Sequence, residues 1–210
     1  MQKTVNFLFV IDVSGSMYGQ KISSVNAALM ECLTELKQIS CSDDEYDIKV
    51  SIITFAETMQ IQVINENPRS ISAPHINVEA KTDGFYSVTY YDCMYNGLRQ
   101  LFENGRIADE KQGENTFVFL ISDAKPVDEN DYRDAFDKIQ RISGFKNAAR
   151  YFSFAEEKSD KYNKNSVKFV NYKADRIIRV PEMPGEISKL QMTFFTDFFS
   201  TNDIYDEIFV

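Results

Sequence analysis

The sequence contains few of the side chains on which many metal sites and nucleophilic sites depend. Its 210 residues include three cysteines and one histidine. Three cysteines support neither a disulfide framework nor a zinc site, and they favour a reducing, cytoplasmic compartment. The one histidine, His75, follows Pro74 in a loop-like stretch, so a catalytic triad or a histidine-ligated metal is poorly supported.

Long apolar runs and an excess of positive charge are also absent. No stretch is long and apolar enough to span a bilayer. The formal net charge is −9, which disfavours nucleic acid and anionic membrane surfaces as partners. We expect no signal peptide, because the N-terminus runs straight into a predicted strand. Hydrophobic residues make up 43% of the chain, and the length fits a single α/β domain over residues 1–210.

Strand-like and helix-like patterns alternate along the chain. Apolar runs predict strands, and apolar residues at helical spacing predict helices. The predicted strands are residues 5–11, 48–55, 60–64, 116–122, 150–154 and 177–180, and the predicted helices are residues 22–39, 91–102, 131–142, 167–172 and 186–199. This alternation predicts a three-layer, Rossmann-like α/β fold with a mostly parallel central sheet, one short antiparallel edge strand and helices on both faces.

The end of the first predicted strand is the most informative segment. Asp12, Ser14 and Ser16 follow it at alternate positions, and Gly15 permits a sharp turn. Open α/β sheets bind ligands at the carboxyl ends of their strands. One carboxylate and two hydroxyls are hard oxygen donors, which suit Mg²⁺ first and Mn²⁺ or Ca²⁺ as alternatives. A turn in which Asp12 only caps the next helix would need no metal.

Residues 12–16, Asp-Val-Ser-Gly-Ser, resemble the Asp-x-Ser-x-Ser signature of von Willebrand factor A (vWA) domains, where it forms the metal-ion-dependent adhesion site (MIDAS). Residues 12–29, 50–56 and 194–200 look like the bacterial, tellurite-resistance-associated TerY-like members of that family. The resemblance implies a metal-dependent protein-binding module. It also implies an association with kinase or phosphatase partners in a stress or phage-related system, as in some members.

The resemblance assigns the loop after the strand at 116–122 to the same site. Residues 122–128 read Ser-Asp-Ala-Lys-Pro-Val-Asp, where the family usually has Thr-Asp-Gly-x-Pro-Thr-Asp. The first aspartate of that pattern binds the metal, commonly through water, which implies Asp123 as a ligand. Ala124 replaces the glycine, which matters if the backbone there needs a positive φ. Asp128 suits a cap at the N-terminal side of the next helix better than the metal.

The loop over residues 83–93 departs most from the family, which usually has a ligating threonine just before a helix. The matching position holds Val88, which cannot ligate a metal. A shift of one residue gives Thr89, and the opposite shift gives Ser87. We favour Thr89 because its hydroxyl is next to the predicted helix start. The alternative is that either hydroxyl only caps the helix.

Tyrosines gather around these predicted loops. Tyr18, Tyr86, Tyr90 and Tyr91, together with Ser87, are predicted to form a partner-binding rim around the metal. An equally good interpretation is that two of the four tyrosines Tyr86, Tyr90, Tyr91 and Tyr95 pack in the core.

These features predict a protein-binding module and not an enzyme. A cation with few direct carboxylate ligands stays electrophilic and would accept an Asp or Glu side chain of a partner protein. One alternative is a degenerate scaffold without metal. The other is a metal-dependent phosphoryl-transfer hydrolase, which is disfavoured because Ser14 stands where Asp-x-Asp enzymes need a second carboxylate. The glycine-rich phosphate-binding motif is also absent from the sequence.

Overall fold

Six strands form one sheet in the order β3-β2-β1-β4-β5-β6. The computed structural model describes residues 2–42, 45–80, 85–107, 115–128, 132–156 and 173–190. The strands are β1 (Lys3–Asp12), β2 (Tyr46–Phe55), β3 (Met59–Glu66), β4 (Thr116–Ser122), β5 (Ala149–Phe154) and β6 (Arg176–Arg179). Neighbouring strands are parallel except at the β2–β3 edge, which is antiparallel. The predicted sheet, mostly parallel with one antiparallel edge strand, is therefore confirmed.

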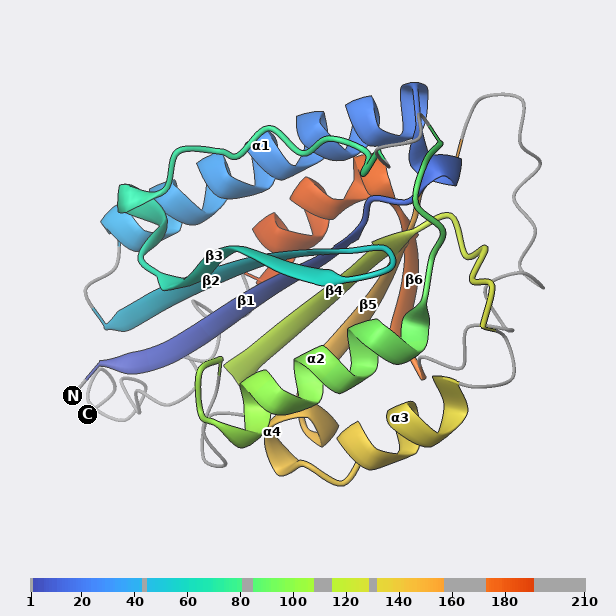
Figure 1. Cartoon of the computed structure of the whole chain (residues 1–210). Coiled ribbons are helices and arrows are strands. Elements are labelled where there is room, and N and C mark those ends of the chain that lie inside the picture. Colours follow the sequence, from blue (N-terminus) through green and yellow to red (C-terminus); the bar gives the residue numbers. More distant parts are fainter. Residues whose placement is uncertain are drawn as a thin grey trace, which may run out of the picture.

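Helices cover both faces of the sheet (Figure 1). On one face lie α1 (Gln20–Ser42) and a helix over residues 183–190, which follows the 3-10 turn η4 (Val180–Glu182). On the other face lie α2 (Tyr91–Glu103), α3 (Tyr132–Ile139) and α4 (Ser143–Lys146). Two further 3-10 turns are η1 (Gly15–Met17) and η2 (Pro68–Ser70). Within the described residues, no helix has the length and apolar character needed to cross a membrane.

The hydrophobic core is split by the sheet into two clusters. Successive residues of a strand point to opposite faces, so β1 contributes to both clusters. Phe7, Phe9 and Ile11 pack in the cluster under α1, whereas Leu8 and Val10 pack in the cluster under α2 and α3. A strand that is buried on both faces has a continuous apolar sequence, and this is why residues 5–11 predicted a buried strand.

Some predicted helix bounds differ from the structure. The predicted helix 131–142 is interrupted after Ile139, because residues 141 and 142 donate to carbonyls three positions back and the helical ladder ends there. The chain turns and α4 begins at Ser143, which brings Phe145 into the core beside α2. The last helix begins at residue 183, before the predicted 186. The predicted segments 167–172 and 191–199, and residue 131, lie outside the described residues.

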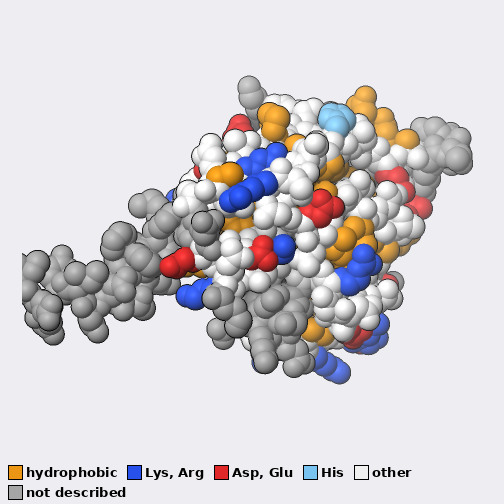
Figure 2. All heavy atoms as spheres, turned by 90° about the vertical axis from the view of Figure 1, so that its left-hand side faces the viewer, with side chains coloured by type: hydrophobic (Ala, Val, Ile, Leu, Met, Phe, Trp, Pro, Cys, Tyr) orange, Lys and Arg blue, Asp and Glu red, His pale blue; other side chains and the backbone are white. Residues whose placement is uncertain are grey.

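The two ends of the sheet have different surfaces. The end at which the parallel strands begin faces the viewer in Figure 2, where hydrophobic and charged side chains alternate in small groups. At the opposite end the parallel strands finish. Asp12 is the last residue of β1, and Asp123 directly follows the neighbouring strand β4. Parallel pairing therefore brings the loops after β1 and β4 together at one edge of the sheet.

Candidate metal centre

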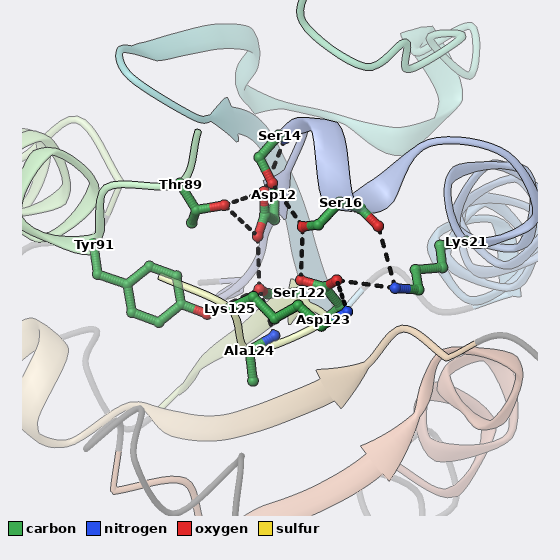
Figure 3. Close-up of polar contacts among 10 residues, drawn as sticks. All are labelled: Asp12, Ser14, Ser16, Lys21, Thr89, Tyr91, Ser122, Asp123, Ala124 and Lys125. Carbon is green, nitrogen blue, oxygen red and sulfur yellow. Dashed lines mark hydrogen bonds and ion pairs between the residues drawn. The ribbon is translucent and has the colours of Figure 1, made fainter. Parts of the chain in front are cut away.

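Asp12 is the centre of a group of hydroxyls at this edge (Figure 3). Its carboxylate is buried and accepts hydrogen bonds from the Ser14 backbone N–H at 2.9 Å and the Ser122 hydroxyl at 2.7 Å. The Thr89 hydroxyl lies 3.2 Å from both of its oxygens. All of these donors are neutral. Burial therefore raises the pKa of Asp12 from 3.8 to about 6, although the hydrogen bonds oppose the shift.

The two serine hydroxyls of the first loop lie beside this carboxylate. Ser14 Oγ and Ser16 Oγ are 3.2 Å apart, and the Ser16 hydroxyl donates to Asp123 Oδ1 over 3.0 Å. A hydroxyl has one proton and two lone pairs, so Ser16 can donate to Asp123 and still act as an oxygen ligand. The turn η1 holds this loop in place through Met17, which is buried in the core.

Gly15 is required by the close approach of a second loop. Its φ is not in the left-handed region, so the sharp turn expected from the sequence does not explain the glycine. A Cβ atom at Gly15 would lie 2.5 Å from Tyr86 Cβ, which is closer than two carbon atoms can pack. The Gly15 N–H also donates to the Ser87 carbonyl oxygen over 2.8 Å. The loop before α2 therefore rests directly on the first loop.

Thr89 is the residue that the loop before α2 presents to Asp12. It is buried, and its carbonyl oxygen accepts a hydrogen bond from the Val127 N–H at 3.0 Å. Val88, at the position that matches the family pattern, is exposed. Of the two alternatives left open by the sequence, Thr89 is the one whose hydroxyl contacts Asp12.

Asp128 joins the same loop to the segment after β4. Its two carboxylate oxygens accept the backbone N–H groups of Tyr91 at 3.0 Å and Asp92 at 2.6 Å, at the start of α2. A carboxylate at this end of a helix satisfies unpaired N–H groups and the helix dipole. Asp128 is therefore a cap of α2, which the sequence did not predict. Residues 129–131, which precede the next helix along the chain, lie outside the described residues, so the predicted cap of that helix stays a prediction.

The second carboxylate, Asp123, is paired with lysines. Lys21 Nζ lies 2.9 Å and Lys125 Nζ lies 3.3 Å from the same oxygen, Asp123 Oδ2. Lys21 is buried with Asp123, whereas the Lys125 side chain is 60% exposed. The sequence interpretation did not include Lys21 in the site. A lysine in the first turn of a helix, where the dipole disfavours a cation, is the signal that could have found it.

Ser122 is a second residue of the site that the sequence interpretation missed. Besides donating to Asp12, its hydroxyl oxygen accepts the Tyr91 hydroxyl at 2.9 Å and the Ala124 N–H at 3.0 Å. The Ala124 backbone has a φ of 59°, a conformation that an alanine adopts only at a cost. The available signal for Ser122 was its position: it is a hydroxyl residue at the end of a predicted strand, directly before the candidate ligand Asp123.

Tyr91 and Ser87 do not belong to an exposed rim. Tyr91 is buried beneath the site, where its hydroxyl bonds to Ser122 and its ring packs in the core, so its assignment to the rim was wrong. Ser87 is also buried, because its backbone pairs with Gly15 on one side and with Glu79 on the other. The sequence could not separate these residues from their exposed neighbours, because the loop has no regular periodicity.

The exposed rim around the site contains aromatic and aliphatic side chains. The described residues include nine exposed large hydrophobic side chains, and six of them lie on the three loops of the site: Tyr18, Phe85, Tyr86, Val88, Tyr90 and Val127. The rings of Tyr18 and Tyr86 lie 5.1 Å apart. Beside this pair, a cavity of about 450 Å³ opens between the start of α1 and residues 75–78. Tyr18, Tyr86 and Tyr90 are therefore exposed around the site, and their role in partner binding stays a prediction.

The donor set fits a hard divalent cation. Among the described residues, no three His, Cys, Asp or Glu side chains gather in a way that could hold a metal ion. The site instead brings together two carboxylates and three hydroxyls, from Asp12, Ser14, Ser16, Thr89 and Asp123. Oxygen donors of this kind suit Mg²⁺, Mn²⁺ or Ca²⁺. A buried carboxylate with only neutral donors is costly, and a cation would offset that cost.

Comparison with known proteins gives the family. The sequence model of the protein family described as the von Willebrand factor type A domain matches residues 6–190 of this chain. The inter-alpha-trypsin inhibitor heavy chain H3 of Mesocricetus auratus is 26% identical over 136 residues, which are 64% of this chain and 14% of that protein. The chain therefore spans a small part of that relative's length.

Two solved structures have a similar fold. The conserved hypothetical protein BatB from Bacteroides thetaiotaomicron superposes with a TM-score of 0.52 and 14% identity, covering 91% of this chain and 98% of that one. The ArnB paralog VWA2 from Sulfolobus acidocaldarius superposes with a TM-score of 0.50 and 18% identity, covering 89% of this chain and 44% of that one. With the family match over residues 6–190 and the α/β sheet described above, the chain belongs to the von Willebrand factor type A domain family.

Proposed function

We propose that this vWA domain binds a protein partner through a divalent cation, Mg²⁺ in the first place. Asp12, Ser14, Ser16, Thr89 and Asp123 would hold the cation, as in a MIDAS. The observation that carries the proposal is the setting of Asp12, a buried carboxylate that meets only neutral donors within a group of hydroxyl oxygens. vWA domains commonly mediate protein–protein interactions, which supports a binding role for this edge of the sheet.

The chemistry of the donors favours an acidic partner. When bound, the cation would supply a positive charge that a carboxylate can coordinate. On the protein side, Asp12 contributes an anionic oxygen that no lysine neutralises in the contacts described above, and the hydroxyls contribute neutral oxygens. Asp123 contributes less charge because Lys21 and Lys125 are bound to it. Little anionic charge would then oppose an Asp or Glu side chain from a partner.

The exposed rim indicates what surrounds that acidic residue. Hydrophobic side chains that gather on three adjoining loops are typical of an interaction surface. Tyr18 and Tyr86 offer amphipathic rings beside the cavity, and Val127, which is hydrogen bonded to Thr89 through its backbone, offers an exposed aliphatic surface. We therefore propose a partner segment in which aromatic or aliphatic residues flank the acidic residue.

The biological setting in the proposal comes from the resemblance to TerY-like members. We propose that the protein acts in the cytoplasm, in a bacterial stress or phage-related system, with kinase or phosphatase partners. Cys32, Cys41 and Cys93 are free thiols, which supports a reducing compartment. We propose no catalytic activity, because Ser14 stands where a phosphoryl-transfer enzyme needs a second carboxylate two residues after the first, and because Asp123 is paired with Lys21.

Calorimetric titration with Mg²⁺ and Mn²⁺ tests the cation site. The native protein should bind one cation, and Asp12→Ala should lower the affinity by at least about 100-fold, or about 2.8 kcal/mol. Asp47→Ala is the matched control, because Asp47 lies at the start of β2, at the opposite end of the sheet, and should leave the affinity unchanged. A folded Asp12→Ala protein with native Mn²⁺ affinity would contradict the proposal.

Capture of partners from a host extract tests the binding role. A protein retained by the native domain in Mg²⁺ should be lost in chelator and should not be retained by Asp12→Ala. Single changes of the partner's Asp and Glu residues to the amides should identify the residue that coordinates the cation. Retention that is undiminished in chelator would mean that this surface acts as an ordinary interface without metal.

A further inference from the structure

Lys21 is a buried cation inside the candidate metal centre. Its ammonium donates to Asp123 Oδ2 at 2.9 Å and to the Ser16 carbonyl oxygen at 3.2 Å. Both are groups of the site's own loops, as the close-up shows (Figure 3). The side chain is 5% exposed, so water screens this charge little. A positive charge is therefore built into the protein next to residues that would hold a divalent cation.

Two features of the position of Lys21 are unfavourable for a cation. It lies in the first turn of α1, where the helix dipole disfavours a cation. Burying an ammonium is costly unless it is paired and hydrogen bonded. A lysine in this place therefore depends on Asp123, and the Asp123 carboxylate is correspondingly committed to Lys21.

The contacts of Asp123 leave it with little uncompensated charge. Its Oδ1 accepts the Ser16 hydroxyl, and its Oδ2 is shared by Lys21 and Lys125. Of these two lysines, Lys125 is mostly exposed, so its effect is weakened by solvent. Lys21 is buried, so its charge is weakly screened and compensates the Asp123 carboxylate more effectively than the charge of Lys125 does.

We propose that Lys21 is an internal counter-cation that lowers the affinity of the site for divalent cations. The ammonium neutralises Asp123 and repels a second cation, so that Asp12 alone supplies uncompensated anionic charge for binding. The inference rests on the proposed cation site, and it adds a residue that sets the strength of that site without being a ligand.

The test is calorimetric titration with Mn²⁺ alone on Lys21→Gln. Glutamine keeps an N–H donor near Asp123 and removes the charge. We expect Mn²⁺ to bind at least about tenfold more tightly, equivalent to about 1.4 kcal/mol. Lys125→Gln is the matched control, because it removes a charge from the same carboxylate oxygen on the solvent side. The Mn²⁺ affinity of the Lys125→Gln protein should differ from that of the native protein by less than about threefold.

Thermal unfolding gives a readout that does not depend on a loaded site. Without metal, Lys21→Gln should melt below the native protein, because Asp123 loses its buried partner. Saturating Mn²⁺ should raise its melting temperature by more than it raises that of the native protein. Lys21→Arg keeps the charge and should retain near-native Mn²⁺ affinity. If the Lys21→Gln protein is unfolded without metal, its folding on addition of Mn²⁺ measures its Mn²⁺ affinity. If Mn²⁺ does not fold it, the proposal is overturned.

The outcomes separate this proposal from the proposed function. If neither the native protein nor Lys21→Gln binds Mn²⁺, the cation site itself is wrong. If the native protein binds Mn²⁺ and the Lys21→Gln protein binds it equally or more weakly, only the role of Lys21 is overturned. A Lys125→Gln protein with the same gain as Lys21→Gln would also overturn it, because burial would then not matter.

Discussion

The candidate metal centre has two halves, one around Asp12 and one around Asp123. The sheet places both carboxylates in the same way, but their charged surroundings differ. Asp12 and Asp123 follow the neighbouring parallel strands β1 and β4 and lie at the same edge. Among the described residues, Asp12 accepts hydrogen bonds from backbone and hydroxyl donors only, whereas Asp123 is paired with two ammonium groups. The sheet therefore places an aspartate at a strand end, and the residues packed against that aspartate decide its charge balance.

The difference also has consequences for folding. The Asp12 half carries an uncompensated buried charge, so we expect it to destabilise the metal-free domain at neutral pH. The Asp123 half is an ion pair that closes the loop after β4 onto the first turn of α1. One half would therefore gain from a cation, and the other half already contains one.

The largest expected effect is on the Asp12 half. In chelator at pH 7, Asp12→Asn should raise the free energy of unfolding by up to about 3 kcal/mol, from the shift of pKa from 3.8 to about 6. The unfolded chain releases this proton near pH 4 and the folded protein near pH 6. The stability of the native protein should therefore fall between these values, and the advantage of Asp12→Asn should grow over the same range and stay constant above it.

Urea unfolding at several pH values from 4 to 8 measures this difference, with Asp47→Asn as the control at the other end of the sheet. The Asp47→Asn protein should show no such pH-dependent gain. A native protein that is more stable than Asp12→Asn at pH 7 without metal would show that the two halves do not differ in the proposed way.

A smaller effect, on the Mn²⁺ affinity, is expected from removing the Thr89 hydroxyl, which lies beside the Asp12 carboxylate. Thr89→Val keeps the shape of the side chain and removes an oxygen 3.2 Å from both Asp12 oxygens. Mn²⁺ affinity, measured by calorimetry, should fall about tenfold, or about 1.4 kcal/mol. Ser87→Ala in the same loop should change it less than about twofold. The reverse order would mean that the loop presents Ser87 and that the register of the site is wrong by two residues.

The smallest effect should come from the backbone of the Asp123 half. Ala124 has a φ of 59°, which costs an L-residue roughly 1–2 kcal/mol, part of which a glycine loses again through its greater freedom in the unfolded chain. Ala124→Gly should therefore raise the free energy of unfolding by about 1 kcal/mol, measured by urea unfolding. Ala73→Gly, in an exposed loop without a positive φ, should lower it slightly. Destabilisation by Ala124→Gly would show that packing of the methyl group outweighs the strain.

Much of the fold was predictable because it depends on patterns with a period. The alternation of apolar strands and amphipathic helices gave the α/β class and a mostly parallel sheet with one antiparallel edge strand, which the structure confirms. The helix at residues 131–142 was wrong in its length, because an apolar spacing that continues through Ile142 hides the turn after Ile139. That Asp12, Ser14 and Ser16 bind a cation stays a prediction.

The residues that the sequence could not place lie where segments distant in the chain meet. Gly15 depends on the approach of Tyr86, and the choice of Thr89 over Ser87 depends on which hydroxyl reaches Asp12. Tyr91 looked like its exposed neighbours in the sequence, but its ring is buried against Phe55, Tyr95 and Tyr132. Loops have no period, so their contacts do not show in the order of their residues.

By itself, the sequence determined the fold class and the position of one carboxylate and two hydroxyls after a buried strand, because hydrophobic periodicity and strand ends are local properties. Only the tertiary structure decided the charge of the site. Lys21 and Asp123 are 102 residues apart, and their ion pair exists because parallel pairing of β1 and β4 brings the start of α1 beside the loop after β4. An electrostatic balance between remote segments depends on distance in space, and the linear order of residues does not contain that distance.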